Sequence, residues 1–444
     1  MDRNTLSACS LLSHAFYNLA SPVLFRSLVI DDTSPTHDIH AFLRDLRAHA
    51  ICGPANLVKN LTLQGAGWNE DEHVELSIID VHTIFAILAE LPSAHSLKLV
   101  GILVKRSHDA KTAPKQRRSL KNLELHHLAF DLSRRAGAGY AVMGDKRVLC
   151  SFVQMLNMLC TVENMTIYDT ETIHINKHNL NWESEPEFTM STARFLGRLR
   201  TSRTRIKHLV SQEGTVSHDV YLELLKSSSS LKDLQTMRIS DTYKSIYSFL
   251  RGSLARNLTH LHLDIEPDEV HSVPFRMSEM KLDLACCIRL ATLRISTIVG
   301  EWGRSEEESQ RDIKDSASRF AAALEAACIQ APDTVIIIEI EVVDSRRSPL
   351  PNDTSVLLDA AIDWMAADAA LARRRDLQKV SFKFLFHPSE RRCYLDCREA
   401  MKVKEVTHKA QIDLIKANLP NTSSRRNLLT VACEPSHDSC PVVL

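Results

Sequence analysis

A six-residue pattern, Leu-x-x-Leu-x-Leu, recurs along most of this chain and limits its fold more than any other feature. In its best copy, Leu258–Leu263, aliphatic residues alternate with polar ones, as in a strand with one buried face. If Ile, Val, Met, Phe or a small residue can replace Leu, the copies begin at Phe25, Val58, Ala94, Leu120, Val162, Ile206, Leu234, Leu258, Leu290, Val335 and Leu377. The starts lie about 35 residues apart on average, a period typical of stacked repeat architectures.

Amphipathic stretches between the copies predict helices. In 81–91 and 149–159, apolar residues recur at steps of three and four, and each stretch lies just upstream of a copy. The sequence therefore predicts an α/β leucine-rich-repeat solenoid with a curved parallel sheet inside and helices outside. The alternative is an ordinary α/β protein with Leu in its buried strands. The repeated Leu spacing favours the solenoid, because continuous apolar runs are enough for buried parallel strands.

The first thirty residues predict a short helical cap. Apolar residues at three- and four-residue steps indicate an amphipathic helix or a tight pair of helices: Leu6, Cys9, Leu12, Phe16 and Leu19. Solenoids need such a cap, because their terminal repeats otherwise expose an apolar end.

This segment also resembles part of a known module. The run 6–16 resembles the second half of an F-box, and 24–28 (Leu-Phe-Arg-Ser-Leu) resembles a junction common in fungal F-box proteins. The leucine-proline pair and inserting helix of the first half are missing, so the box is N-terminally incomplete. The resemblance implies a non-catalytic substrate-recognition subunit of an SCF-type ubiquitin ligase that binds a Skp-type adaptor. The implied adaptor-binding residues are Leu6, Cys9, Leu11, Leu12 and Phe16.

Three regions are expected along the chain. Residues 1–27 form the F-box-like cap, and 28–386 form an irregular leucine-rich-repeat solenoid. In residues 387–444 the leucine pattern fades, so a C-terminal helix over 407–419 and a flexible tail from Pro420 are predicted.

Motifs that would indicate catalysis are missing from the sequence. It contains no Gly-rich phosphate loop, no H-E-x-x-H and no G-x-S-x-G, so we expect neither an enzyme nor a cofactor. Two sets of Cys and His were considered as zinc ligands and rejected, because their spacings match no standard site. They are His387, Cys393, Cys397 and His408, and Cys433, His437 and Cys440.

Charge and hydropathy limit the partners. Lys plus Arg is 54 and Asp plus Glu is 55, so no global field favours nucleic acid or anionic lipid. There is no run of 18 apolar residues and no secretion signal, so we expect no membrane association and a cytoplasmic or nuclear location. The basic stretch 105–118 fits a solvated loop better than a nuclear import signal.

A polar surface is the remaining candidate for function. Residues that alternate with the buried leucines must share the opposite face of the sheet, predicted to be concave. We expect an unknown protein substrate to bind there, at Glu124, Arg238, His260, His262 and Arg294. The alternative function is a leucine-rich interaction scaffold without a link to a ubiquitin ligase.

Overall fold

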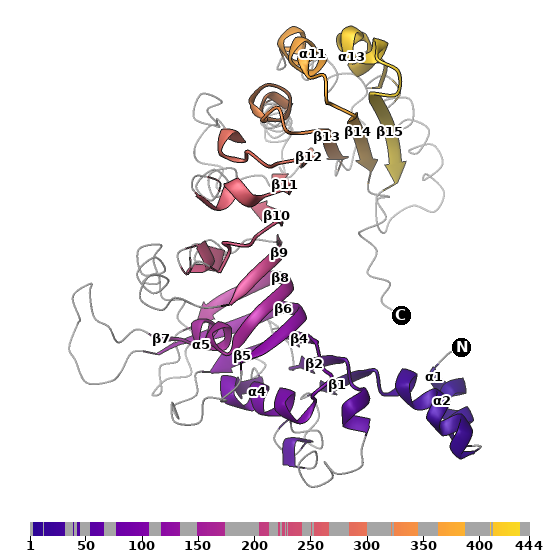
Figure 1. Ribbon diagram of the computed structural model, residues 1–444, viewed down its shortest axis with the longest axis vertical. Coiled ribbons are helices and arrows are strands. Elements are labelled where there is room, and N and C mark those ends of the chain that lie inside the picture. The colour runs from indigo at the N-terminus through magenta and orange to yellow at the C-terminus, as the bar shows by residue number, and fades with distance from the viewer. Residues whose placement is uncertain are drawn as a thin grey trace, which may run out of the picture. The chain divides into compact units, whose positions relative to one another are not determined.

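The computed structural model describes residues 3–11, 13–31, 39, 42–44, 54–65, 77–105, 117–133, 149–173, 204–212, 221–222, 224–226, 228, 230–241, 250, 253–265, 284–299, 321, 324–344, 363–386, 409 and 412–435 (Figure 1). Two compact units make up the chain, unit 1 (Met1–Leu234) and unit 2 (Gln235–Leu444). The domain boundaries expected near residues 27 and 386 stay predictions.

Unit 1 contains parallel strands that alternate with helices. Its described helices are α1 (Arg3–Ser10), α2 (His14–Leu24), η1 (Pro54–Leu57), α4 (Val81–Glu90) and α5 (Ser151–Asn157). Its described strands are β1 (Ser27–Asp31), β2 (Asn60–Gln64), β3 (Ser77–Asp80), β4 (Ser96–Val100), β5 (Ile102–Lys105), β6 (Arg118–Ser133), β7 (Leu149–Cys150), β8 (Leu159–Ile173) and β9 (Arg205–Gln212). The main sheet has the order β1-β2-β4-β6-β8-β9, and each neighbouring pair is parallel.

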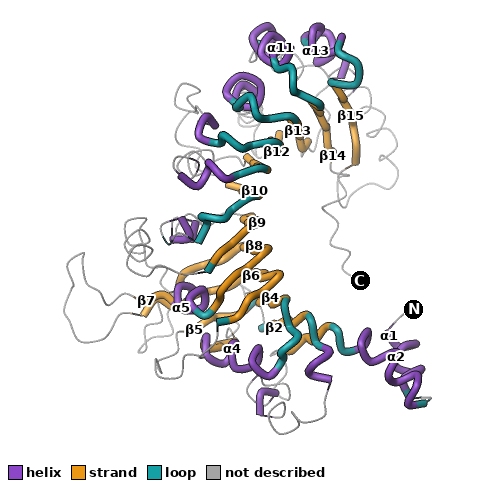
Figure 2. The backbone as a smooth tube through the Cα atoms, in the orientation of Figure 1, coloured by secondary structure: helices purple, strands orange, loops and turns teal. Residues whose placement is uncertain are grey.

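Unit 2 has the same arrangement, with shorter helical segments along one side of its sheet (Figure 2). Its helical segments include η3 (Ser253–Asn257), η5 (Leu284–Cys286), η6 (Ala326–Gln330), α11 (Trp364–Arg373) and α13 (Pro420–Ser424). The strands are β10 (Thr236–Asp241), β11 (His260–Ile265), β12 (Thr292–Val299), β13 (Ile337–Asp344), β14 (Lys379–Phe386) and β15 (Leu429–Pro435). They pair in chain order, and every pair is parallel.

The leucine pattern coincides with the strands. Each of the eleven predicted copies leads into a strand or lies within one, from β1 to β14. Within each unit, successive copies form hydrogen-bonded parallel neighbours, as a repeat solenoid requires and a scattered set of strands would not. The predicted α/β repeat-solenoid fold is therefore confirmed.

A shared backbone turn precedes the strand in most copies of the pattern. The N–H of Leu258 donates to the carbonyl of Ala255 at 3.3 Å. The carbonyl of the next residue, Thr259, accepts from two residues of the following copy, Ala291 at 2.8 Å and Thr292 at 3.0 Å. The same first bond recurs at Val58, Ala94, Leu234, Leu290, Val335, Leu377 and Leu428. These copies therefore enter their strands through the same backbone turn.

The core lies beneath the aliphatic positions of the pattern. Leu261, Leu263, Leu293 and Ile295 are at most 1% exposed. Burying one such side chain contributes about 1.5–3 kcal/mol, so stacked ladders of them stabilise each sheet. The alternating positions of the same strands are left on the opposite, polar face.

Three aligned strand positions of unit 1 are each followed by a glycine or by a residue with positive φ. Gly65 follows β2, and a Cβ built there would lie 2.2 Å from the carbonyl oxygen of Gly101, so only glycine fits. Gly101 separates β4 from β5 at a φ of 60°, and His127 bends β6 at a φ of 48°. Because Gln64, Val100 and His126 are aligned across the sheet, the residues that follow them, Gly65, Gly101 and His127, share one level.

The expected tail from Pro420 is wrong for residues 420–435. Asp368 of α11 accepts hydrogen bonds from the backbone N–H groups of Asn421 and Thr422, at 3.0 and 2.8 Å, and so fixes the start of α13. Strand β15 then pairs with β14. The residues Leu428, Val431 and Cys433 fit the pattern with substitutions and form a twelfth copy.

Candidate functional site

The polar face of unit 2 aligns charged side chains in two rows across its strands. The register brings residues from consecutive strands side by side. The first row contains Arg238, His262, Arg294, Glu339 and Ser381, and the second row contains Ser240, Asp264, Ser296, Glu341 and Lys383. Neighbouring strands lie about 4.8 Å apart, so adjacent members of a row are within reach of one another.

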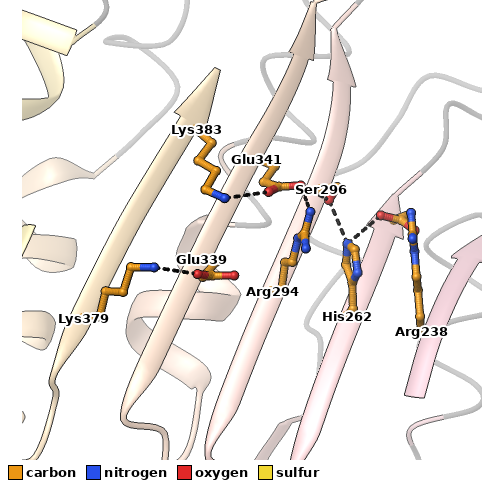
Figure 3. A network of polar contacts seen from close by, with 9 residues as sticks. Arg238, His262, Arg294, Ser296, Glu339, Glu341, Lys379 and Lys383 are labelled. Carbon is orange, nitrogen blue, oxygen red and sulfur yellow. Dashed lines mark hydrogen bonds and ion pairs between the residues drawn. The ribbon is translucent and has the colours of Figure 1, made fainter. Parts of the chain in front are cut away.

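Three diagonal bonds connect the rows, each from one strand to the next (Figure 3). Arg238 Nε donates to Asp264 Oδ2 at 2.7 Å. His262 Nε2 lies 2.9 Å from Ser296 Oγ, and Arg294 Nη2 donates to Glu341 Oε2. The repeated direction follows from the register, because every pair joins the same two positions of consecutive copies.

Strand β14 adds two basic side chains to this set. Lys379 Nζ donates to Glu339 Oε1 at 2.8 Å, and Lys383 Nζ lies 3.8 Å from Glu341 Oε1 (Figure 3). We call the whole set the β10–β14 network. Its members are Arg238, His262, Asp264, Arg294, Ser296, Glu339, Glu341, Lys379 and Lys383.

The network contains carboxylates that are held in their charged form. Burial alone would raise the pKa of Asp264, but the hydrogen bond and charge of His262 and of Arg238 lower it to about 2. For Glu339, burial likewise opposes ionisation, and the hydrogen bond and charge of Lys379 dominate and lower its pKa. Both groups are therefore fixed anions at neutral pH.

The polar face of unit 1 is built differently. Its strands carry amides that bond to the preceding strand of the sheet: Asn60 Nδ2 donates to Ser27 Oγ at 3.0 Å, and Asn164 Nδ2 donates to Asn122 Oδ1 at 2.9 Å. These bonds are neutral, so this part of the face carries little charge.

One charged cluster interrupts those amides. Glu124 lies 3.6 Å from Lys98 and 3.5 Å from His126. Burial lowers the pKa of His126, as do the charges of Lys98 and His127, while Glu124 raises it. The ring of Tyr168 lies beside both histidines, with centroids 5.7 Å from His126 and 5.0 Å from His127.

Comparisons with protein-family models, with curated proteins and with solved structures found no match for this chain.

Four of the five predicted partner-binding residues belong to unit 2. Arg238, His262 and Arg294 are members of the network. His260 is exposed at the start of β11, where its Nδ1 lies 2.9 Å from Thr259 Oγ1. Glu124 lies in unit 1.

Sequence reasoning did not assign six members of the network to the site: Asp264, Ser296, Glu339, Glu341, Lys379 and Lys383. The available signal was the alternation of Glu339 and Glu341 within an otherwise apolar run. Asp264, Glu341 and Lys383 each lie one residue beyond the six-residue pattern, which is why it does not include them.

The predicted adaptor-binding residues lie on the N-terminal helices. Leu11 is 85% exposed and Phe16 is 49% exposed, whereas Leu6 is half-buried. Ser13 caps α2 by accepting from the N–H of Phe16 at 3.3 Å. The side chain of Cys9 and the whole of Leu12 lie outside the described residues.

No metal site is found among the residues that the structure describes, where no three His, Cys, Asp or Glu side chains group suitably. The rejected zinc ligands lie outside that part of the chain, except Cys433 in β15. In the same part, no helix has the length and apolar character to cross a membrane.

Proposed function

We propose that this chain is a non-catalytic recognition protein that binds another protein on the polar face of unit 2. The observation that supports this most strongly is the β10–β14 network, in which charged side chains from five consecutive strands are fixed by mutual bonds. Fixed side chains lose little entropy on binding, and fixed charges favour one partner over another.

The main alternative to a binding role is catalysis, because Ser296, His262 and Asp264 are of the residue types found in a hydrolytic triad. In such a triad the serine and the carboxylate contact opposite nitrogens of the imidazole. Here Ser296 Oγ and Asp264 Oδ1 both contact Nε2 of His262, at 2.9 and 2.8 Å. A single nitrogen cannot accept the serine proton and donate to the carboxylate at once, so this arrangement favours a structural role.

Binding on this face can be tested by photo-crosslinking from two exposed positions of unit 2. A benzophenone amino acid in place of His260 would lie beside the network. The matched control places the same group at Met365, which is 85% exposed on α11. We expect His260 to crosslink a distinct protein whose yield falls when Arg294 is changed to Gln. The proposal fails if both positions capture the same proteins, or if the R294Q change has no effect.

We further propose that the N-terminal helices dock a Skp-type adaptor, which would make the chain a substrate-recognition subunit of an SCF-type ubiquitin ligase. The support is their exposed apolar surface, together with the F-box resemblance. Leu11, Phe16, Leu19 and Val23 are between 49% and 85% exposed on and between two short helices. Apolar residues gathered in this way are typical of helical surfaces that bind another protein.

The ligase link is tested by co-purification with a purified Skp-type adaptor. We expect Phe16→Asp or Leu19→Asp to weaken binding about tenfold or more, because each places a charge in an apolar contact. Met365→Asp, at an equally exposed apolar site in unit 2, is the control and should have no effect. Absence of adaptor binding by the unaltered chain would favour the alternative, a scaffold without a ligase link.

A further inference from the structure

Within the network, the acidic side chains are more deeply buried than the basic ones. The carboxylates of Asp264, Glu339 and Glu341 are 16%, 19% and 4% exposed. Their basic partners Arg238, Arg294, Lys379 and Lys383 are 39%, 35%, 42% and 28% exposed. In every pair the acid lies beneath the base, so an approaching molecule meets the basic groups first.

We propose that this face docks an acidic segment of a partner protein, rich in Asp and Glu. The inference rests on the proposed function and specifies its partner. Four basic groups stand against three carboxylates, so the network keeps a positive excess. A partner's carboxylates add the missing negative charge without displacing any bond already made.

The carboxylates beneath also orient the bases. Arg294 bonds to Glu341 through Nη2, one of the five N–H donors that a guanidinium offers. Lys379 is fixed in the same way by Glu339, and Lys383 lies 3.8 Å from Glu341 in an ion pair. An oriented guanidinium can take a second carboxylate without first losing its rotational freedom, which favours affinity for acidic groups.

The spacing of the bases fits an extended peptide that crosses the strands. Arg238 and Arg294 lie two strands apart, or about 10 Å, and β10 and β14 lie about 19 Å apart. Extended chain advances about 3.3 Å per residue, so about six residues span the network and acids three apart meet successive arginines. A short acidic segment is therefore sufficient.

Nucleic acid fits this surface less well. Each base is already partly neutralised by its carboxylate, and the network contains no Phe, Tyr or Trp ring on which a nucleobase could stack. The chain as a whole has a formal net charge of −1, so no wider positive field supports binding of a polyanion.

Selection of displayed random peptides on the full chain tests the proposal. The parallel selections use the double variant Arg294→Gln/Lys383→Gln and the control Lys98→Gln, which removes a similarly exposed base from unit 1. We expect the selected peptides to be enriched in Asp and Glu. The double variant should bind these peptides about tenfold more weakly than the parent chain, whereas Lys98→Gln should bind them as the parent does. Higher salt should weaken peptide binding by the parent chain. Circular dichroism establishes that both variants are folded, and the double variant Lys379→Gln/Lys383→Gln serves if the first is not.

The outcomes separate the inference from the proposed function. Selected peptides that depend on the network but lack acidic enrichment overturn the acidic partner and leave protein binding on this face intact. Peptides that bind the double variant and the parent equally overturn both. Tighter network-dependent binding of a single-stranded oligonucleotide than of any acidic peptide also overturns the inference.

Discussion

Glu124 in unit 1 and Glu341 in unit 2 each lie between two basic side chains on a polar sheet face, yet their surroundings differ. The basic neighbours are Lys98 and His126 in unit 1, and Arg294 and Lys383 in unit 2. The side chain of Glu124 is 37% exposed, whereas that of Glu341 is 4% exposed. The same charge arrangement is therefore a solvated surface cluster in one unit and part of the packed structure in the other.

The long side chains around Glu341 account for its burial. Arg294 and Lys383 reach it from the strands on either side of β13, and Ser296 Oγ donates to it at 3.3 Å (Figure 3). Arg294 and Lys383 keep 35% and 28% of their own side-chain surface exposed while they contact the buried carboxylate. Buried ion pairs contribute little net stability, but they are costly to break, because the remaining charge is left without a partner.

The largest expected effect is that of Glu341→Gln. Loss of one partner from a buried pair typically costs about 3–5 kcal/mol, and partial exposure of Arg294 reduces this to about 2 kcal/mol here. Hydrogen exchange of peptides from β12 to β14 measures the loss in unit 2 by itself. The double variant Glu341→Gln/Arg294→Gln should recover part of the loss, because no unpaired guanidinium remains. A loss below about 0.5 kcal/mol would contradict the role assigned to burial.

Acid should affect the two units in different pH ranges. The pKa of Asp264 is about 2 in the folded chain and 3.8 ordinarily, so its stabilising contribution is complete above pH 3.8 and is lost as pH falls toward 2. The difference corresponds to about 2 kcal/mol. His126 has a pKa below its ordinary 6.5 when folded, so the unfolded chain binds its proton first and unit 1 loses stability as pH falls below 6.5.

Exchange protection of β10–β12 and of β4–β8, corrected for intrinsic rates, follows the two units separately. Asp264→Asn should reduce the loss in unit 2 below pH 3.8, to which Glu339 also contributes, and leave the profile of unit 1 unchanged. Identical profiles in both units would show that neither group sets its unit's acid response.

The sequence predicts more of the fold than of the candidate site. Buried positions such as Leu261 and Leu263 recur because each strand repeats the same backbone turn, so a linear pattern is enough to find them. The polar pairs depend on which residue of the next strand lies opposite. Arg238 is visible in the sequence as an outward residue, but its pairing with Asp264 follows from register over 26 residues. The pattern also missed β15, because Leu428 begins its copy within the expected tail.

A smaller effect is expected for Asn122→Ala on the neutral part of unit 1. The change removes the acceptor of Asn164 Nδ2, and an intramolecular hydrogen bond of this kind contributes about 1 kcal/mol. Asn60→Ala, which breaks an exposed bond to Ser27, is the matched control and should cost less. Exchange of peptides from β6 and β8 measures the first change, and a cost equal to that of Glu341→Gln would mean that charge does not distinguish the two faces.

The smallest effect is expected for Glu124→Gln. Exposed ion pairs contribute between about 0 and 1 kcal/mol, because water replaces the lost partner, so we expect a loss of at most about 0.5 kcal/mol. Glu124 raises the pKa of His126, so the same change should lower that pKa further, which nuclear magnetic resonance titration of the imidazole detects. The titration shows that the ion pair was broken even when stability does not move. If Glu124→Gln nevertheless destabilises unit 1 as much as Glu341→Gln destabilises unit 2, depth of burial is not what separates the two carboxylates.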